Sequence, residues 1–187
     1  MKHIRWSFLC FFVFFVSNIH AENSEFSPEN SQKSIEIKIR DLLEEKLKIS
    51  SKLSVMDNDG NDLRVTALFA ADRTKGLPAI VVFVDTKIVN ADTNGDPLSQ
   101  TINIVSSAEI NLISSERLKL LEWANAWNSN LLPIQAHIVK GQLLASVNLI
   151  TAKASPISEE IIIASYLSLV QIWPSIIKSL NQNKLVR

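Results

Sequence analysis

The chain has 187 residues with 19 basic and 19 acidic side chains, so its net charge is zero when histidine is neutral. That balance argues against nucleic acid as a partner and against strong attraction to an anionic membrane surface. The single cysteine, Cys10, excludes an intramolecular disulfide.

The N-terminal segment has the three parts of a secretory signal. Lys2 and Arg5 form a basic start, the stretch from Trp6 to Val16 is almost entirely apolar, and a polar break ends at Ala21. The apolar run is shorter than the roughly 20 residues that a membrane-spanning helix needs. We therefore expect cleavage after Ala21 and a periplasmic or secreted product, with an uncleaved anchor as the alternative.

Cleavage would lower the basic count from 19 to 17 against 19 acidic residues and remove Cys10. The mature chain would then carry a net charge of −2 and suffice for one domain of ordinary size. The predicted organisation is a signal peptide (1–21), a polar linker (22–32), a single domain (33–182) and a short tail (183–187).

The first predicted helix covers 33–49, where apolar residues from Ile35 to Leu47 recur at helical spacing. The charged residues between them are interpreted as a solvated helix face. From about 52 to 113 the period changes to alternation, which predicts an antiparallel meander of strands. Asp59-Gly60 and Asn94-Gly95 are turn dipeptides that separate these strands.

The stretch "DNDGND" also suggests a calcium loop, because Asp57, Asp59 and Asp62 lie close together. If Gly60 took the glycine position of a standard loop, the first ligand position would fall on Val55, which cannot bind calcium. A hairpin turn is therefore preferred here and at "DTNGD".

A second helix is predicted from Ser114 or Ser115 to about Asn128, followed by two strands that turn at Gly141. Trp127 is interpreted as a core residue, and Asn128 as a cap that bonds to exposed helix carbonyls or to the next strand. A docking surface and a ligand cage are the alternatives for this tryptophan-rich helix end.

The last helix opens at "SPISEE", where Glu159 and Glu160 suit the positive end of the helix dipole. No charged residue occurs from Ile161 to Ile177, and Pro174 predicts a kink. A helix so widely apolar needs cover on more than one side. We therefore predict an interface that includes Tyr166, Val170 and Trp173, with a membrane segment as the alternative.

No pattern for catalysis or for a cofactor is present in the sequence. His137 would be the only histidine after cleavage, so a histidine cluster on a metal is excluded. Neither a glycine-flanked serine elbow nor a glycine-rich phosphate loop occurs. We expect no enzyme activity, no metal and no cofactor.

The stretch "LLEWANAWNSNLLPIQAHIVKGQLLASVNLI", followed by "SPISEEIII", resembles the YbjN family of putative bacterial sensory transduction regulators. The matching positions are Asn125, Trp127 and Asn128 at a helix end and Gly141 at a hairpin turn. The resemblance implies an α+β domain similar to type III secretion chaperones, in which helices pack on an antiparallel sheet. Those chaperones pair as dimers and hold extended segments of other proteins.

The function expected from these observations is that of an exported, non-enzymatic YbjN-like protein that acts through protein contact, as a chaperone or adaptor. We expect an unidentified protein partner, a homodimer, no nucleic acid and no integral membrane segment after cleavage. The alternative is a periplasmic module that binds a small ligand or lipid in an apolar pocket between the last helix and the sheet. A hydrolase is the third and weakest reading.

Overall fold

The computed structural model describes residues 25–56, 59–60, 62–72, 74, 77–129 and 133–187. The predicted signal peptide therefore lies outside the described residues, as does Asp57.

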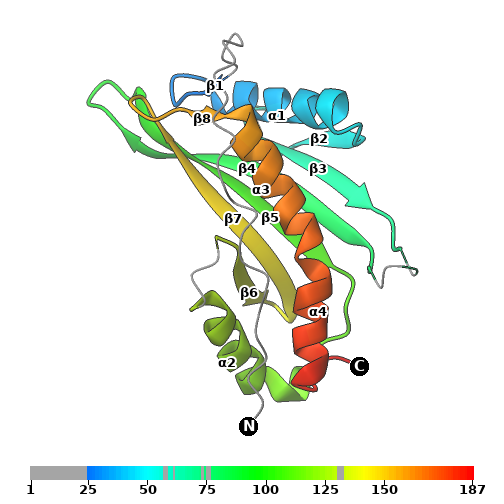
Figure 1. The fold of residues 1–187 in the computed structure, drawn as a ribbon. Helices are drawn as coiled ribbons and strands as arrows, with labels where there is room; N and C mark the ends of the chain where they lie inside the picture. Colours follow the sequence, from blue (N-terminus) through cyan, green and yellow to red (C-terminus); the bar gives the residue numbers. More distant parts are fainter. Residues whose placement is uncertain (1–24, 57–58, 61, 73, 75–76, 130–132) are drawn as a thin grey trace.

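The centre of the fold is an antiparallel sheet of six strands in the order β2-β3-β4-β5-β7-β6 (Figure 1). A short two-stranded ribbon, β1-β8, lies at one end of it. The expected α+β class is confirmed, with a meander of four strands and a C-terminal hairpin. The strands are β1 Glu25–Phe26, β2 Ser51–Val55, β3 Leu63–Phe69, β4 Ile80–Ala91, β5 Pro97–Ala108, β6 Gln135–Val139, β7 Gln142–Ala152 and β8 Ile157–Ser158.

Both aspartate-rich stretches connect antiparallel strands, as predicted. Gly60 has φ +67° and lies between β2 and β3, and Gly95 has φ +89° and lies between β4 and β5. These are backbone conformations that glycine adopts without strain. In the second turn, the Oδ1 atom of Asp92 accepts hydrogen bonds from the backbone N–H of Asn94 (2.8 Å) and Asp96 (3.0 Å). The carboxylate of Asp92 thus stabilises a turn.

The helices are α1 Gln32–Lys46, α2 Arg117–Asn128, α3 Glu159–Gln171 and α4 Trp173–Gln182, with a 3₁₀ turn at Ser114–Glu116 before α2. Helix α1 begins where the side chain of Ser31 accepts a hydrogen bond from Ser34 N (3.2 Å). The third predicted helix is divided into α3 and α4. Pro174 lies at the start of α4 and has no N–H to continue the ladder, so the predicted kink is confirmed.

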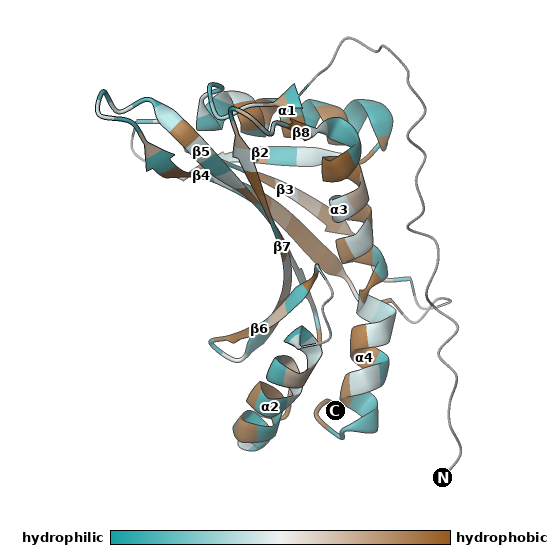
Figure 2. Ribbon diagram, turned by 60° about the vertical axis from the view of Figure 1, so that its left-hand side comes forward, coloured by the Kyte–Doolittle hydropathy of each residue, from teal (hydrophilic) through white to brown (hydrophobic). Residues whose placement is uncertain are grey.

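All four helices pack on one face of the sheet, which we call the helix face (Figure 2). Paired residues across the strands show why: Val65, Val84, Ile104 and Val147 lie side by side and are buried. Residues one position along each strand point to the opposite face, which we call the open face. The core therefore lies entirely between the helix face and the helices.

The segment predicted as a linker, 22–32, is part of the fold over its described residues, so that prediction is wrong there. Phe26 in β1 is fully buried. Polar residues on the helix face hold this segment: Thr151 Oγ1 donates to the carbonyl of Phe26, and Gln100 Nε2 donates to the carbonyls of Pro28 and Asn30, both at 2.7 Å. Buried side-chain donors thus fix a stretch whose composition is that of a loop.

The predicted tail, 183–187, is also packed against the domain, which corrects the expected boundary. Leu185 is buried, and its carbonyl accepts a hydrogen bond from Ile113 N (3.0 Å). Arg187 N donates to the carbonyl of Asn111 (3.0 Å). The last residues therefore lie against the segment that enters α2.

One helical stretch among the described residues, Glu159–Gln182, is long and apolar enough to cross a membrane, judged by length and composition alone. Its buried side chains recur every three or four residues and belong to the main core: Ile162, Tyr166, Leu169, Trp173, Ile176 and Leu180. That stripe is the packing of a helix on a sheet.

Candidate functional site

A buried carboxyl group, Glu36 on α1, is the most unusual polar side chain of the core. It exposes no surface, and it accepts hydrogen bonds from Leu63 N (2.9 Å), Thr86 N (3.1 Å) and Thr86 Oγ1 (2.7 Å). Burial raises the pKa of Glu36, while the three donors oppose that shift by stabilising the ionised form. Gln32 Nε2 adds a bond to the carbonyl of Thr86 (2.8 Å). This cluster attaches α1 to β3 and β4.

Glu36 was missed by sequence reasoning. The spacing of apolar residues could have indicated its burial. Glu36 precedes Ile39 by three residues and Leu43 by seven, so all three lie on the inward face of α1.

The described residues contain no group of three or more histidine, cysteine or acidic side chains that could hold a metal ion. His137 does have a partner that the sequence did not indicate: its Nε2 lies 3.0 Å from Ser146 Oγ on the neighbouring strand β7. Nucleophilic catalysis also needs a group that orients the histidine and donors for an oxyanion. No carboxylate accepts a hydrogen bond from His137 among the described residues. The pair is interpreted as a cross-strand polar contact.

The helix end containing both tryptophans is attached to the hairpin, as expected, but the buried tryptophan is a different one. Trp123 is 8 % exposed, whereas Trp127 is only partly buried at the border of the core. The prediction that Trp127 fills the core is therefore wrong. Trp123 takes that place because its Nε1 also donates to Ser179 Oγ on α4 (2.9 Å). The Nε1 atom of Trp127 is buried and has no hydrogen-bond partner among the described residues.

Asn128 holds the helix end to the next strand, which confirms one of its two predicted roles. Its Nδ2 donates to the carbonyl of Ala136 (2.9 Å), and its Oδ1 accepts from Ala136 N (2.7 Å). The side-chain amide of Asn128 thus takes the place of a neighbouring strand beside the edge strand β6.

The two remaining motif positions have separate roles. Gly141 has φ +80° in the β6–β7 turn, next to Lys140 at φ +49°, which confirms the predicted hairpin. Asn125 is exposed on α2, and its backbone carbonyl accepts a hydrogen bond from Ser129 N (3.0 Å).

A groove with a volume of about 520 Å³ lies between α2 and the C-terminal part of the chain. Trp123 and Trp127 line one wall, with ring centroids 5.5 Å apart and planes inclined by 34°. Ser179, Asn183 and Leu185 line the other. We call this the tryptophan groove. Its lining mixes aromatic rings with hydroxyl and amide groups.

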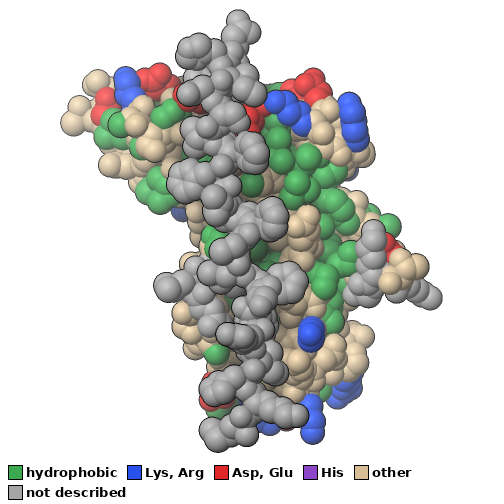
Figure 3. Space-filling view, in the orientation of Figure 1, with side chains coloured by type: hydrophobic (Ala, Val, Ile, Leu, Met, Phe, Trp, Pro, Cys, Tyr) green, Lys and Arg blue, Asp and Glu red, His purple; other side chains and the backbone are tan. Residues whose placement is uncertain are grey.

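The interface predicted on the last helix is wrong for two of its three residues. Tyr166 and Trp173 expose no surface, and Trp173 Nε1 donates to Ser106 Oγ on β5 (3.0 Å). Both are the large side chains of the inward stripe, so the sheet already covers them. Only Val170 remains partly exposed. Elsewhere on α3, Ile161 is 47 % exposed. Figure 3 shows hydrophobic side chains on the surface in the region of α3.

The apolar pocket expected between the last helix and the sheet is filled. Ile162, Tyr166 and Leu169 are fully buried in that space and belong to the same core cluster as the strand residues. The packing of the described residues therefore leaves the small-ligand alternative without support at its predicted place.

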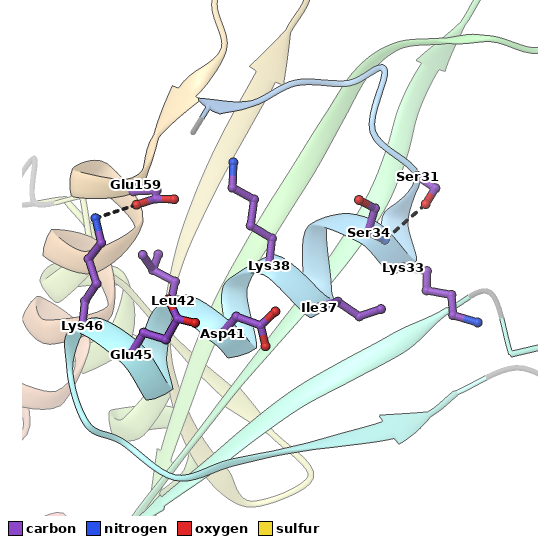
Figure 4. Close-up of a pocket in the computed structure, with 10 residues that line it drawn as sticks. All are labelled: Ser31, Lys33, Ser34, Ile37, Lys38, Asp41, Leu42, Glu45, Lys46 and Glu159. Atoms are coloured by element: carbon purple, nitrogen blue, oxygen red, sulfur yellow. Dashed lines mark hydrogen bonds and ion pairs between the residues drawn. The ribbon is translucent and has the colours of Figure 1, made fainter. Parts of the chain in front are cut away.

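A second groove, of about 620 Å³, follows the exposed side of α1 (Figure 4). Its charged lining is mixed in sign, and Lys46 Nζ already pairs with Glu159 Oε2 at 2.9 Å. Lys38 Nζ donates to the carbonyl of Glu25 (3.0 Å), and burial lowers the pKa of Lys38. Because these charges are engaged within the chain, the groove selects no ligand of one sign.

In comparisons with known proteins, no family model matches the chain, and no curated protein or solved structure matches it.

Proposed function

We propose that this protein is exported, has no catalytic activity, and acts by holding a segment of another polypeptide, as the resemblance to the YbjN family implies. The observation that carries the proposal is the tryptophan groove, which is lined by two neighbouring indole rings on one side and by Ser179 and Asn183 on the other. Aromatic rings cover apolar side chains, and hydroxyl and amide groups bond to a peptide backbone. An extended, mostly apolar segment therefore fits this lining.

The rim of the groove adds to this argument. Lys119 and Glu122 both line it, so their opposite charges do not favour a strongly acidic or basic ligand. The proposed export is based on the sequence pattern that ends at Ala21, which predicts a mature chain that begins at Glu22. N-terminal sequencing of the envelope form tests that part, and a product that retains Trp6 to Val16 would contradict it.

Site-specific photocrosslinking in the native envelope tests the groove. A photoreactive side chain at Ala126, which lines the groove, is expected to capture one defined polypeptide, with the crosslink mapping to an extended apolar stretch of it. The matched control is the adjacent residue Asn125, which is exposed and does not line the groove. Equal capture from both positions, or capture of a lipid or small molecule from Ala126, would overturn the proposal.

A further inference from the structure

The turn between β4 and β5 contains the only asparagine of the chain that is followed by glycine, Asn94-Gly95. Asparagine is one of the chemically labile residues of proteins. Both residues of the pair are exposed, and a Cβ atom placed on Gly95 would meet no atom within 4 Å other than those of its chain neighbours. Because glycine has no Cβ, no side chain shields the backbone nitrogen of Gly95 from the amide group of Asn94.

The side-chain amide of Asn94 is unbound, which sets it apart from that of Asn128. Among the described residues, Asn94 enters hydrogen bonds only through its backbone, where its N–H donates to Asp92 Oδ1 (2.8 Å). Asn128 also precedes a small residue, Ser129, but its Nδ2 donates to the carbonyl of Ala136 (2.9 Å) and its Oδ1 accepts from Ala136 N (2.7 Å). The Asn128 amide is therefore held in place, whereas the Asn94 amide can rotate.

An asparagine with a free amide next to glycine can close a ring. The backbone nitrogen of Gly95 bonds to Cγ of Asn94, the C–N bond of the side-chain amide breaks, and ammonia leaves with the proton of the Gly95 N–H. The product is a cyclic succinimide. Water then opens the ring: attack at Cγ gives aspartate, and attack at the backbone carbonyl carbon gives isoaspartate, in which the chain continues through the side chain. Water is the only co-reactant.

The hydrogen bonds of the turn hold the reacting atoms apart. Gly95 N donates to the carbonyl of Asp92 (3.1 Å), so its N–H points across the turn. The carboxylate of Asp92 supports this arrangement, because its Oδ1 also accepts from Asn94 N and from Asp96 N (3.0 Å). Ring closure requires the peptide plane between Asn94 and Gly95 to rotate, which breaks the bond to the Asp92 carbonyl. The reaction therefore waits for the turn to open.

We propose that Asn94 is a deamidation site of this protein and that the carboxylate of Asp92 controls how fast the reaction runs. Each event adds a negative charge to a turn that already holds Asp92 and Asp96, and isoaspartate lengthens the backbone there. The turn follows Ala91, which pairs with Pro97 at the end of the hairpin, so the change alters the tip of the hairpin. The site shares no residue with the tryptophan groove and is independent of the proposed function.

Incubation of the purified, folded protein in mildly alkaline buffer, followed by peptide mass mapping, tests the site. Alkaline buffer speeds ring closure because it removes the proton from more of the backbone nitrogen. The peptide that contains Asn94 is expected to gain the mass difference between a hydroxyl and an amino group, in aspartate and isoaspartate forms, while the peptide that contains Asn128 stays unchanged. A folded protein in which Asn94 converts no faster than Asn128 overturns the site.

Two variants test the role of Asp92. Asp92→Ala removes the acceptor of Asn94 N and Asp96 N, and it is expected to speed conversion of Asn94 about 2- to 10-fold, the factor that corresponds to one typical hydrogen bond. Circular dichroism checks that the fold is kept.

The matched control is Asp96→Ala, which removes the same charge from the same turn. Among the described residues, Asp96 enters hydrogen bonds only through its backbone, so this variant is expected to convert at the wild-type rate. Unchanged conversion in Asp92→Ala overturns the role of Asp92. Equal acceleration by both variants overturns it too, because the lost charge would then account for the effect.

Discussion

The buried carboxyl of Glu36 allows a quantitative test of how α1 is attached to the sheet. In the variant Glu36→Ala, the backbone N–H groups of Leu63 and Thr86 lose the acceptor that lies 2.9 Å and 3.1 Å from them. A buried donor without a partner costs about 1–3 kcal/mol, so the two together cost about 2–6 kcal/mol. A domain of this size is stable by about 5–15 kcal/mol, so the loss is a large share of the total.

Glu36→Gln separates shape from charge. The amide oxygen can accept the bonds from Thr86, but its NH₂ group then faces the N–H of Leu63, which is also a donor. We expect a loss of about 1–3 kcal/mol, smaller than for alanine. Urea denaturation of both variants measures the order. A loss below about 1 kcal/mol for Glu36→Ala would show that water or a shift of α1 replaces the carboxylate, and would refute the reasoning.

The pH dependence gives a second measurement on the same residue. Burial raises the pKa of Glu36 above its usual value of 4.5, so the folded protein holds this proton in a range where the unfolded chain has lost it. The part of the stability that depends on protonation of Glu36 is therefore complete below about pH 4.5 and is lost as the pH rises through the folded pKa, while the hydrogen bonds from Leu63 and Thr86 remain. Glu36→Gln should lack this component. A wild-type and a Gln variant with identical pH profiles would contradict the assignment.

Three further substitutions test polar groups of aromatic side chains, two of which have no hydrogen-bond partner among the described residues. Tyr166→Phe should leave stability unchanged or raise it by up to about 1 kcal/mol, because no group of the described residues bonds to the buried hydroxyl. A loss above about 1 kcal/mol in urea denaturation would reveal such a partner. Trp123→Phe should lower the free energy of unfolding by about 1–3 kcal/mol more than Trp127→Phe does, because Trp123 Nε1 loses its bond to Ser179 Oγ. Trp127 Nε1 has no such bond among the described residues. Equal losses in the same assay would contradict this.

The fold could be predicted from the sequence where local signals and burial agree. The alternation of apolar and polar residues predicted the strands. The turns at Gly60, Gly95 and Gly141 were placed correctly because each has a positive φ that most other residues avoid. Pro174 marked the kink for an equally local reason. These features depend on a few neighbouring residues, so no knowledge of the tertiary packing was needed.

The candidate site could be predicted only in part, because it depends on which side of each helix meets the sheet. Trp123 and Trp127 lie one helical turn apart, and the pattern alone did not show that Ser179 on α4 would bond to Trp123. The same limit affected α3, where aromatic residues suggested an interface although Tyr166 and Trp173 form the inward stripe. The apolar surface that remains is on the open face, which only strand pairing reveals.

The pairing of β1 with β8 has a consequence for the order in which the chain can fold. Phe26 is held by Ile157 and by Thr151, a residue 125 positions later in the chain. The β1–β8 pair therefore cannot form until nearly the whole chain has been synthesised. Contacts so distant in sequence slow folding. Under the export proposed above, this delay keeps the domain incomplete until the last strand has left the ribosome.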